Sequence, residues 1–240
     1  GVLLRENIEI AEREQRLLSS DEGVVCWRVC CSPQTNLERG LWRDAIETGM
    51  KKALLEYPYI QPQSCVFDER LEGQIQSRFC TQIEVEESSD ASRIVLSCVR
   101  SSSTTQEHTY MRCFEAPLDK DLLVAWAQSV MGELGLGGVP PWFVGVGLGG
   151  SRNGVVSLAE RALRRPVGKP HQSLALASLE QALLQALNAT SSGVFGLGGD
   201  TVLAVHTASA PCHSRVIPAS LVFQNYLFRM AEYRWREEGV

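Results

Sequence analysis

The chain has 240 residues, of which 44% are hydrophobic and 21% charged, so it can bury a sizeable core as one large domain or as two closely joined ones. Its formal net charge of -5 argues against a broad nucleic-acid surface, and nucleic acid contact is expected only within a ribonucleoprotein. No run of 18 or more apolar residues occurs, which argues against insertion into a membrane.

The chain contains eight cysteines, at positions 26, 30, 31, 65, 80, 98, 113 and 212. Most of them lie in apolar or alternating segments rather than in C-x-x-C pairs. Because a free cysteine behaves as a small hydrophobic residue, we interpret them as reduced, mostly buried thiols. A disulfide framework or a zinc site is the alternative interpretation.

The first half of the chain carries helix and strand patterns in turn. Apolar residues recur with the helical period over 2–18, and branched and aromatic residues at 24–31 predict a strand. Helical spacing returns at 41–55. Apolar and polar residues alternate over 74–85 and 92–99, on either side of a Ser-Ser-Asp-Ala turn. These two segments are therefore expected to form an antiparallel hairpin.

The second half of the chain mixes short strands with longer helices. The expected elements are a helix at 122–134, a strand at 142–146, a helix from 155 that ends at Pro166, a helix at 173–188, strands at 201–207 and 216–223, and a closing helix from about Gln224. Together these patterns predict an α/β (mixed α+β) fold with helices packed on a mixed sheet. We expect one domain over 1–240.

A glycine-rich stretch, PPWFVGVGLGGS at 140–151, contains G-x-G-x-x-G at Gly145, Gly147 and Gly150. A dinucleotide-binding loop would be followed about 20 residues later by an acidic residue, but the segment PVGKP at 166–170 holds none. A P-loop would need Gly-Lys-Ser/Thr, which is also missing. Two interpretations stay open. The glycines allow tight packing of a strand against a helix, or their amides face a small anion at a helix N-terminus.

The longer segment PPWFVGVGLGGSRNGVVSLAERALRRP resembles a segment of iron-sulfur-dependent (class I) fumarases and L-tartrate dehydratase alpha subunits. That segment has the order CPP, several apolar residues, GVGIGG and an alanine- and leucine-rich helix ending in LLRP. Further similarity lies in LRENIEIAERE at 4–14, GVFGLGGD at 193–200 and the segment from Pro211 to Arg229. The resemblance covers nearly all of the chain and is weak over about 60–118. It implies the alpha-domain fold of class I fumarases.

The same resemblance implies that the family's cofactor is lost. In the family, one cysteine in each of the CQDTG, CPP and QCH motifs holds a 4Fe-4S cluster. The matching positions here are Ser19, Val139 and Asn225. Iron in such clusters needs thiolate ligands, so no cluster and no other metal site are expected. The substrate-binding arginine of the family's YLR motif also corresponds to a different residue, Gln61.

Other family features survive and are candidates for residual binding of a small anion. They are Asp21, Gly147, Gly149, Gly150, Gly198, Gly199 and His213. Each also has a structural explanation, since Asp21 can close a turn, His213 can be half-buried and the glycines can be required by the fold. Gly147, Gly149, Gly198 and Gly199 are expected to be mainly structural.

These losses lead to the hypothesis of a catalytically inactive, fumarase-like pseudoenzyme. It would serve as a structural subunit of a larger assembly with other protein subunits, in the mitochondrion or otherwise in the cytoplasm. The contact surface is expected on the closing helix, through Tyr226, Phe228, Met230, Tyr233 and Trp235.

Two other classes of function remain open. The chain could be a cluster-independent hydratase or lyase subunit that acts on a small dicarboxylate with a separate beta chain, with Asp21 and His213 as acid and base. It could also be a sensor that binds a dicarboxylate through its two glycine loops without reaction.

Overall fold

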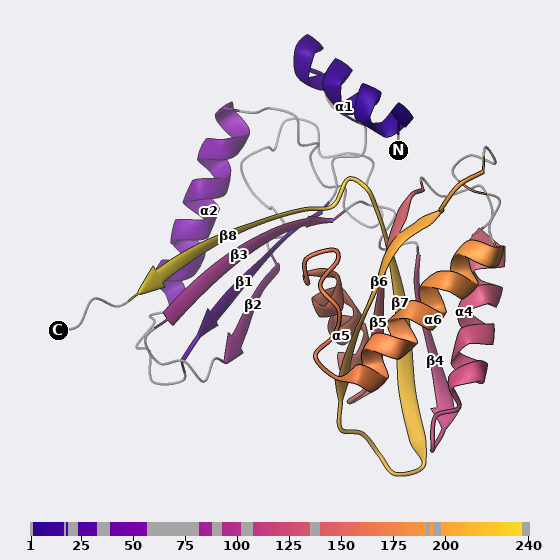
Figure 1. Ribbon diagram of the computed structural model, residues 1–240. Helices are drawn as coiled ribbons and strands as arrows, with labels where there is room; N and C mark the ends of the chain where they lie inside the picture. The colour runs from indigo at the N-terminus through magenta and orange to yellow at the C-terminus, as the bar shows by residue number, and fades with distance from the viewer. Residues whose placement is uncertain are drawn as a thin grey trace, which may run out of the picture. The chain divides into compact units, whose positions relative to one another are not determined.

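The computed structural model describes residues 2–16, 18, 24–32, 39–56, 82–87, 93–101, 108–134, 140–190, 193 and 198–236 (Figure 1). The chain divides into two compact units. One comprises Gly1–Ser103 with Leu227–Val240, and the other comprises Thr104–Tyr226. The mixed α and β architecture expected from the sequence is confirmed. The prediction of a single domain stays a prediction.

The first unit contains a four-stranded sheet and two helices. Its elements are α1 (Val2–Glu14), β1 (Val24–Cys31), α2 (Arg39–Glu56), β2 (Gln82–Glu87), β3 (Arg93–Ser101) and β8 (Arg229–Arg236). The strand order is β2-β1-β3-β8, and β1 runs parallel to β2 but antiparallel to β3. Alternate residues of β1 point to one face, so Val29 and Cys31 pack with Ile46 and Met50 of α2 to form the core.

The expected hairpin between 74–85 and 92–99 is wrong. β2 and β3 are not neighbours, because β1 lies between them and pairs with both. An alternating pattern reveals which face of a strand is buried, but not which strand lies beside it. The parallel pairing of β1 with β2 also places Arg28 opposite Glu84, whose Oε2 lies 2.7 Å from the guanidinium Nη2.

The expected closing helix is also wrong, because residues 229–236 form the edge strand β8. This segment pairs antiparallel with β3, and Tyr233 lies opposite Leu96. Two arguments favour the strand. Tyr and Trp have high strand propensity, and β3 offers a full row of backbone hydrogen-bonding groups to this segment. A contact surface on a C-terminal helix is thereby excluded for these residues.

The second unit contains a mixed four-stranded sheet covered by helices on both faces. Its elements are β4 (Thr109–Glu115), α4 (Lys120–Leu134), β5 (Trp142–Gly149), α5 (Gly154–Leu163), α6 (Leu174–Thr190), β6 (Val202–Ala210) and β7 (Val216–Asn225). The strand order is β4-β7-β5-β6. Strand β7 is antiparallel to its neighbours β4 and β5, and β5 is parallel to β6. Strand β4 was not predicted from the sequence, whereas the other elements of this unit lie close to their expected positions.

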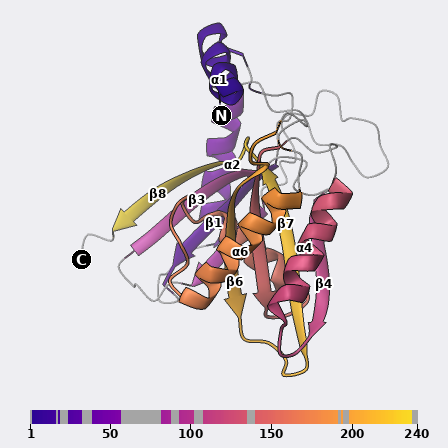
Figure 2. The same ribbon diagram turned by 45° about the vertical axis from the view of Figure 1, so that its right-hand side comes forward.

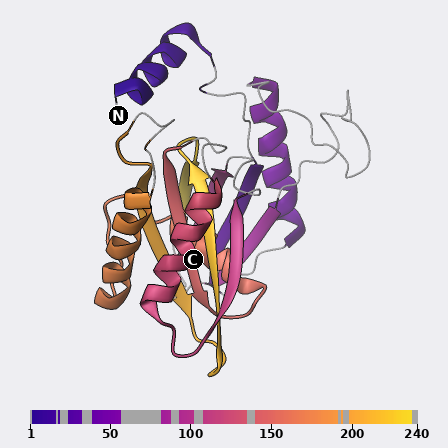
Figure 3. The same ribbon diagram turned by 90° about the vertical axis from the view of Figure 1, so that its right-hand side faces the viewer.

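The main core of this unit lies between the sheet and the helices α4 and α6, which run side by side over one face (Figures 2 and 3). Val144 and Val146 of β5 point to this face and pack against Leu123 of α4 and Leu183 of α6, all fully or almost fully buried. Helix α5 covers the opposite face, where its backbone lies against the glycines of β5. Along β5, valine side chains therefore face α4 and α6, whereas glycines face α5.

Candidate functional site

Gly145 and Gly147 of β5 lie directly beneath helix α5. A Cβ atom at Gly145 would lie 2.2 Å from the carbonyl oxygen of Ala159, and one at Gly147 would lie 2.1 Å from that of Val155. Both distances are far inside van der Waals contact. The first two glycines of the GxG pattern therefore let the helix backbone approach the strand, and the structure gives Gly147 a packing role.

Gly149 and Gly150 turn the chain from β5 toward α5. Both have positive φ angles, +79° and +67°, which favour glycine. The N–H of Gly150 donates to the carbonyl oxygen of Ala210 at the end of β6, at 3.2 Å. A Cβ at Gly149 would lie 3.4 Å from the Cβ of Cys212. The end of β5 and the loop after β6 are therefore in contact.

His213 lies in that same loop between β6 and β7 and is exposed. Its Nδ1 accepts a hydrogen bond from the backbone N–H of Arg215 at 3.2 Å, and the carbonyl oxygen of Arg215 accepts one from Ala116 N–H at 3.0 Å. This loop is thus tied to the residue that follows β4. Among the described residues, the other ring nitrogen, Nε2, has no hydrogen-bond partner.

We use the name carboxyl edge for Gly149, Gly150, Ser151, Cys212 and His213, which lie where β5 and β6 end. The loop that carries Gly149 and Gly150 leads into α5, whose first turn is closed by Ser151. Ser151 Oγ accepts a hydrogen bond from Gly154 N–H at 3.0 Å. In open α/β sheets ligands bind beyond the carboxyl ends of strands, near helix N-termini.

The remaining described candidates lie at the opposite end of the sheet. Gly198 and Gly199 precede β6, have φ angles of +81° and +82°, and would meet no atom within 4 Å if they carried a Cβ. Asn225 ends β7, where it pairs with Trp142 at the start of β5, and its side chain is 0% exposed. We call Gly198, Gly199 and Asn225 the amino edge. Since β5 has 8 residues, the two edges lie roughly 25 Å apart.

The candidates from the family resemblance therefore do not form one cluster. Gly149, Gly150 and His213 come together, Gly198 and Gly199 lie a strand length away, and Gly147 is covered by α5. Asp21, Ser19 and Val139 lie outside the described residues. The sequence pattern did not separate the two edges, because it does not specify the direction in which each strand runs.

The residues that the resemblance aligns with the family's three cluster cysteines do not fit a group held by thiolates. Asn225 is fully buried, and its Oδ1 accepts a hydrogen bond from Gln224 Nε2 at 3.3 Å. An amide oxygen is not a thiolate, and serine and valine stand at the other two positions. In the described ranges no three His, Cys, Asp or Glu side chains gather in a way that could hold a metal ion. The absence of a cluster stays a prediction.

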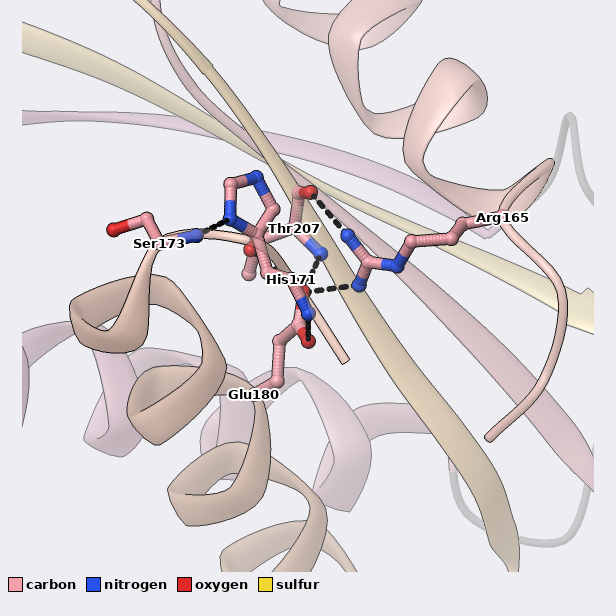
Figure 4. A network of polar contacts seen from close by, with 5 residues as sticks. All are labelled: Arg165, His171, Ser173, Glu180 and Thr207. Carbon is pink, nitrogen blue, oxygen red and sulfur yellow. Dashed lines mark hydrogen bonds and ion pairs between the residues drawn. The ribbon is translucent and has the colours of Figure 1, made fainter. Parts of the chain in front are cut away.

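A buried polar network lies on the same unit, between α6, β6 and the segment after α5 (Figure 4). Arg165 pairs with Glu180 of α6, and Glu180 accepts hydrogen bonds from the N–H and the Oγ of Thr207, at 2.7 and 2.8 Å. The sequence patterns did not single out Glu180. The missed signal is a carboxylate in line with Leu183 and Leu187, the buried stripe of α6.

Two groups at or near the network, Glu180 and His206, have lowered pKa values. Burial alone would raise the pKa of Glu180, but the hydrogen bonds from Arg165 and Thr207 and the charge of Arg165 outweigh it and lower the pKa. For His206, burial lowers the pKa, and the nearby Arg165 charge lowers it further. Glu180 is therefore held as the carboxylate and His206 as the neutral imidazole.

The sequence profile of the family described as Fumarate hydratase (Fumerase) matches residues 2–234, which is nearly the whole chain. The chain belongs to this fumarate hydratase family. It is 39% identical over 93 residues to a provisionally named L(+)-tartrate dehydratase subunit alpha of Methanocaldococcus jannaschii, a match that covers 38% of this chain and 33% of that protein. It is 36% identical over 85 residues to the L(+)-tartrate dehydratase subunit alpha of Escherichia coli K12, covering 35% and 28%. The matched part thus spans about a third of the length of these curated relatives.

Membership of the fumarate hydratase family confirms the resemblance stated from the sequence. The hypothesis that the chain is not an enzyme is wrong in this light, because the relatives are named as subunits of a dehydratase. The comparisons give no support to a scaffold role or to a mitochondrial setting, since these relatives come from an archaeon and a bacterium. In the described part of the chain, no helix is long and apolar enough to span a membrane.

Proposed function

We propose that this chain is the alpha-type part of a hydro-lyase that adds water to, or removes it from, a small dicarboxylate. The supporting observation is the fumarate hydratase family match over residues 2–234, which includes both sheets. Because the relatives are named as alpha subunits, we further propose that a separate beta-type chain completes the enzyme. Catalysis in this proposal does not depend on a cluster at positions 19, 139 and 225.

We place the substrate at the carboxyl edge. Three features support this placement. Gly149 and Gly150, whose positive φ angles favour glycine, carry no side chain that would cover the turn. The N-terminus of α5 favours negative charge. His213 supplies an imidazole ring on the adjoining loop. Asp21, Gly198 and Gly199 stay predictions from the sequence as further contacts of the anion.

His213 is the proposed proton donor. A neutral imidazole that accepts at Nδ1 carries its proton on Nε2, and here Nδ1 accepts from Arg215 N–H. In the dehydration direction a base removes the carbon-bound proton next to one carboxylate, and the released electron pair forms the C=C bond. The C–O bond breaks as this double bond forms, the Nε2 proton joins the departing hydroxyl to give water, and the ring regains a proton from solvent. Asp21 is the base predicted from the resemblance.

The test is the hydration of fumarate by the purified chain, alone and with candidate beta-type chains from the same source. Loss of C=C absorbance reports the reaction, and an iron chelator in parallel samples reports cluster dependence. We expect chelator-resistant turnover, with kcat lowered about 100-fold or more by His213→Gln. No turnover with any beta-type chain, or turnover abolished by the chelator, contradicts the proposal.

A matched control is available at His171. Its Nδ1 accepts from the backbone N–H two residues onward, that of Ser173, at 2.9 Å, in the same local geometry as His213. His171 lies before α6 and away from the carboxyl edge in sequence. His171→Gln is expected to leave kcat unchanged. An equal loss in both variants would show that the histidines act through the fold.

A further inference from the structure

Strand β6 is an edge strand whose sequence favours pairing with another strand. In the described part of the chain only β5 pairs with it. Its residues, VLAVHTASA over Val202–Ala210, include no Asp, Glu, Lys, Arg, Pro or Gly. Uncharged, proline-free segments of high strand propensity are those that add further strands at an open edge.

The outer side of β6 is occupied at Thr207 by two side chains instead of a strand. Thr207 lies opposite Val146 in the parallel ladder with β5. Its N–H donates to Glu180 Oε1 at 2.7 Å, and its carbonyl oxygen accepts from Arg165 Nη1 at 3.4 Å. Both backbone groups of one residue are therefore bound by an ion pair, in the manner in which a neighbouring strand would bind them.

The ion pair is held from elements other than β6. Glu180 comes from α6, Arg165 follows α5, and their side chains are only 8% and 17% exposed (Figure 4). Glu180 also accepts from Thr207 Oγ at 2.8 Å and, through Oε2, from His171 N–H at 3.3 Å. Helix α6 and the segment after α5 thus bring the two side chains together at Thr207 of β6.

Stability alone does not account for a buried ion pair at this place. Removing two charges from water is costly, and apolar residues of similar size often serve the fold as well. The buried stripe of α6 otherwise consists of leucines such as Leu179 and Leu183, so a leucine at position 180 would continue it. A leucine, however, would leave the N–H of Thr207 without its acceptor and the Arg165 guanidinium without its carboxylate partner.

We propose that the Arg165–Glu180 pair is an edge guard, which keeps β6 from pairing with β6 of a second copy of this chain. Two copies of one edge strand can pair antiparallel about a twofold axis, so each would offer the other the same uncharged segment. The edge guard binds the backbone N–H and carbonyl of Thr207, near the middle of that segment. The inference concerns self-association and is independent of the proposed hydro-lyase activity.

The test compares Glu180→Ala with Leu183→Ala in the full chain. Glu180→Ala removes the acceptor of Thr207 N–H, whereas Leu183→Ala weakens the same helix from a fully buried apolar position. The two variants are compared under conditions in which their Tm values are lowered by the same amount. Sedimentation measures self-association, and amide hydrogen exchange at Thr207 measures the protection of its N–H. We expect Glu180→Ala to self-associate at least tenfold more tightly than the unaltered chain. Leu183→Ala is expected to remain monomeric.

A second change separates edge pairing from general unfolding. Ser209 is exposed and stands two residues after Thr207, so its backbone faces the same outer side of β6. Adding Ser209→Lys to Glu180→Ala places a charge on the open edge, which opposes strand addition. We expect the double variant to return to the monomer without recovering its Tm.

Three results overturn the proposal. They are a folded Glu180→Ala that stays monomeric, a Leu183→Ala that associates as tightly, and a double variant that still associates. If Glu180→Ala does not fold, Arg165→Gln is used, since it frees the carbonyl of Thr207 and leaves α6 intact. Self-association at least threefold tighter than that of the unaltered chain is expected, and unchanged association overturns the proposal.

Discussion

Helix α5 lies so close to β5 that Gly145 and Gly147 leave no room for a Cβ atom. The backbone carbonyls of Ala159 and Val155 occupy the two Cβ positions, so the crowding is with backbone atoms and not with the tip of a flexible side chain. A substitution at either glycine must push the helix away from the sheet. This packing explains why a nucleotide-like GxG pattern occurs without the rest of a nucleotide site.

The first prediction concerns Gly147→Ala. Because its Cβ would lie 2.1 Å from the Val155 carbonyl oxygen, the free energy of unfolding is expected to fall by about 1–3 kcal/mol. The control is Gly132→Ala in α4, where a Cβ meets no atom within 4 Å and the helix should gain about 0.5–1 kcal/mol. Urea denaturation measures both. Equal stability of the two variants contradicts close packing of α5 on β5.

The second prediction concerns pH and rests on Glu180 and His206, whose pKa values are both lowered in the folded chain. A group whose pKa is lowered by folding stabilises the fold at pH values above its ordinary pKa. This stabilisation is lost as the pH falls through the pKa of the folded state. The loss begins near pH 6.5 for His206 and near pH 4.5 for Glu180. Stability should therefore decrease as pH falls through both windows.

The variant that isolates the acid window is Glu180→Gln, because glutamine does not titrate. We expect the unaltered chain to lose stability between about pH 4.5 and the lower pKa of folded Glu180, and the variant to show a flatter curve there. Chemical denaturation at a series of pH values measures this slope. Parallel curves for the two proteins below pH 4.5 would mean that Glu180 is not the group responsible.

At the scale of elements, segments with their own strong pattern were predicted well. The strand at 24–31 matches β1, and the helices at 122–134 and 173–188 match α4 and α6 within a few residues. The errors occur where partners decide the structure. β8 has a mixed pattern and becomes a strand because β3 lies beside it.

The third prediction tests the strand at 229–236 directly. An edge strand paired on one side has backbone N–H groups that alternate between the neighbour and the solvent, whereas a helix protects every amide after its first turn. Amide exchange over β8 is therefore expected to alternate with a period of two. Strand β3 is the internal control, since it pairs on both sides and should be protected throughout. Protection of every amide over 232–236 would instead support a helix in this segment.

The candidate site shows the same division between what sequence does and does not specify. Gly149, Gly150 and His213 were recognised through the family resemblance, but their meeting at one edge depends on β5 and β6 running parallel. Arg165 and Glu180 come together because α5 and α6 lie on opposite faces beside the same edge strand. Both groupings are set by topology, which a single sequence does not fix.

On the scale of the whole molecule, the second unit offers two ends at which an anion could bind. At the amino edge, Asn225 is buried and its Oδ1 accepts a hydrogen bond from Gln224. The carboxyl edge retains a titratable group, His213, on an exposed loop. A substrate that must lose and gain protons needs such a group, which favours the carboxyl edge.

The fourth prediction decides between the two edges by ligand-induced stabilisation. A dicarboxylate such as fumarate or L-tartrate that binds only the folded chain at 100 times its Kd raises the free energy of unfolding by about 2.7 kcal/mol. His213→Gln is expected to abolish the resulting rise in Tm, because it alters the carboxyl edge. Gly199→Ala alters the amino edge at a position with φ of +82° and no neighbour within 4 Å. Its own Tm should fall, since alanine is strained there, but the rise on adding ligand should persist. The reverse pattern, with the rise lost in Gly199→Ala and kept in His213→Gln, would move the substrate to the end of the sheet where Asn225 lies and remove His213 from the proposed mechanism.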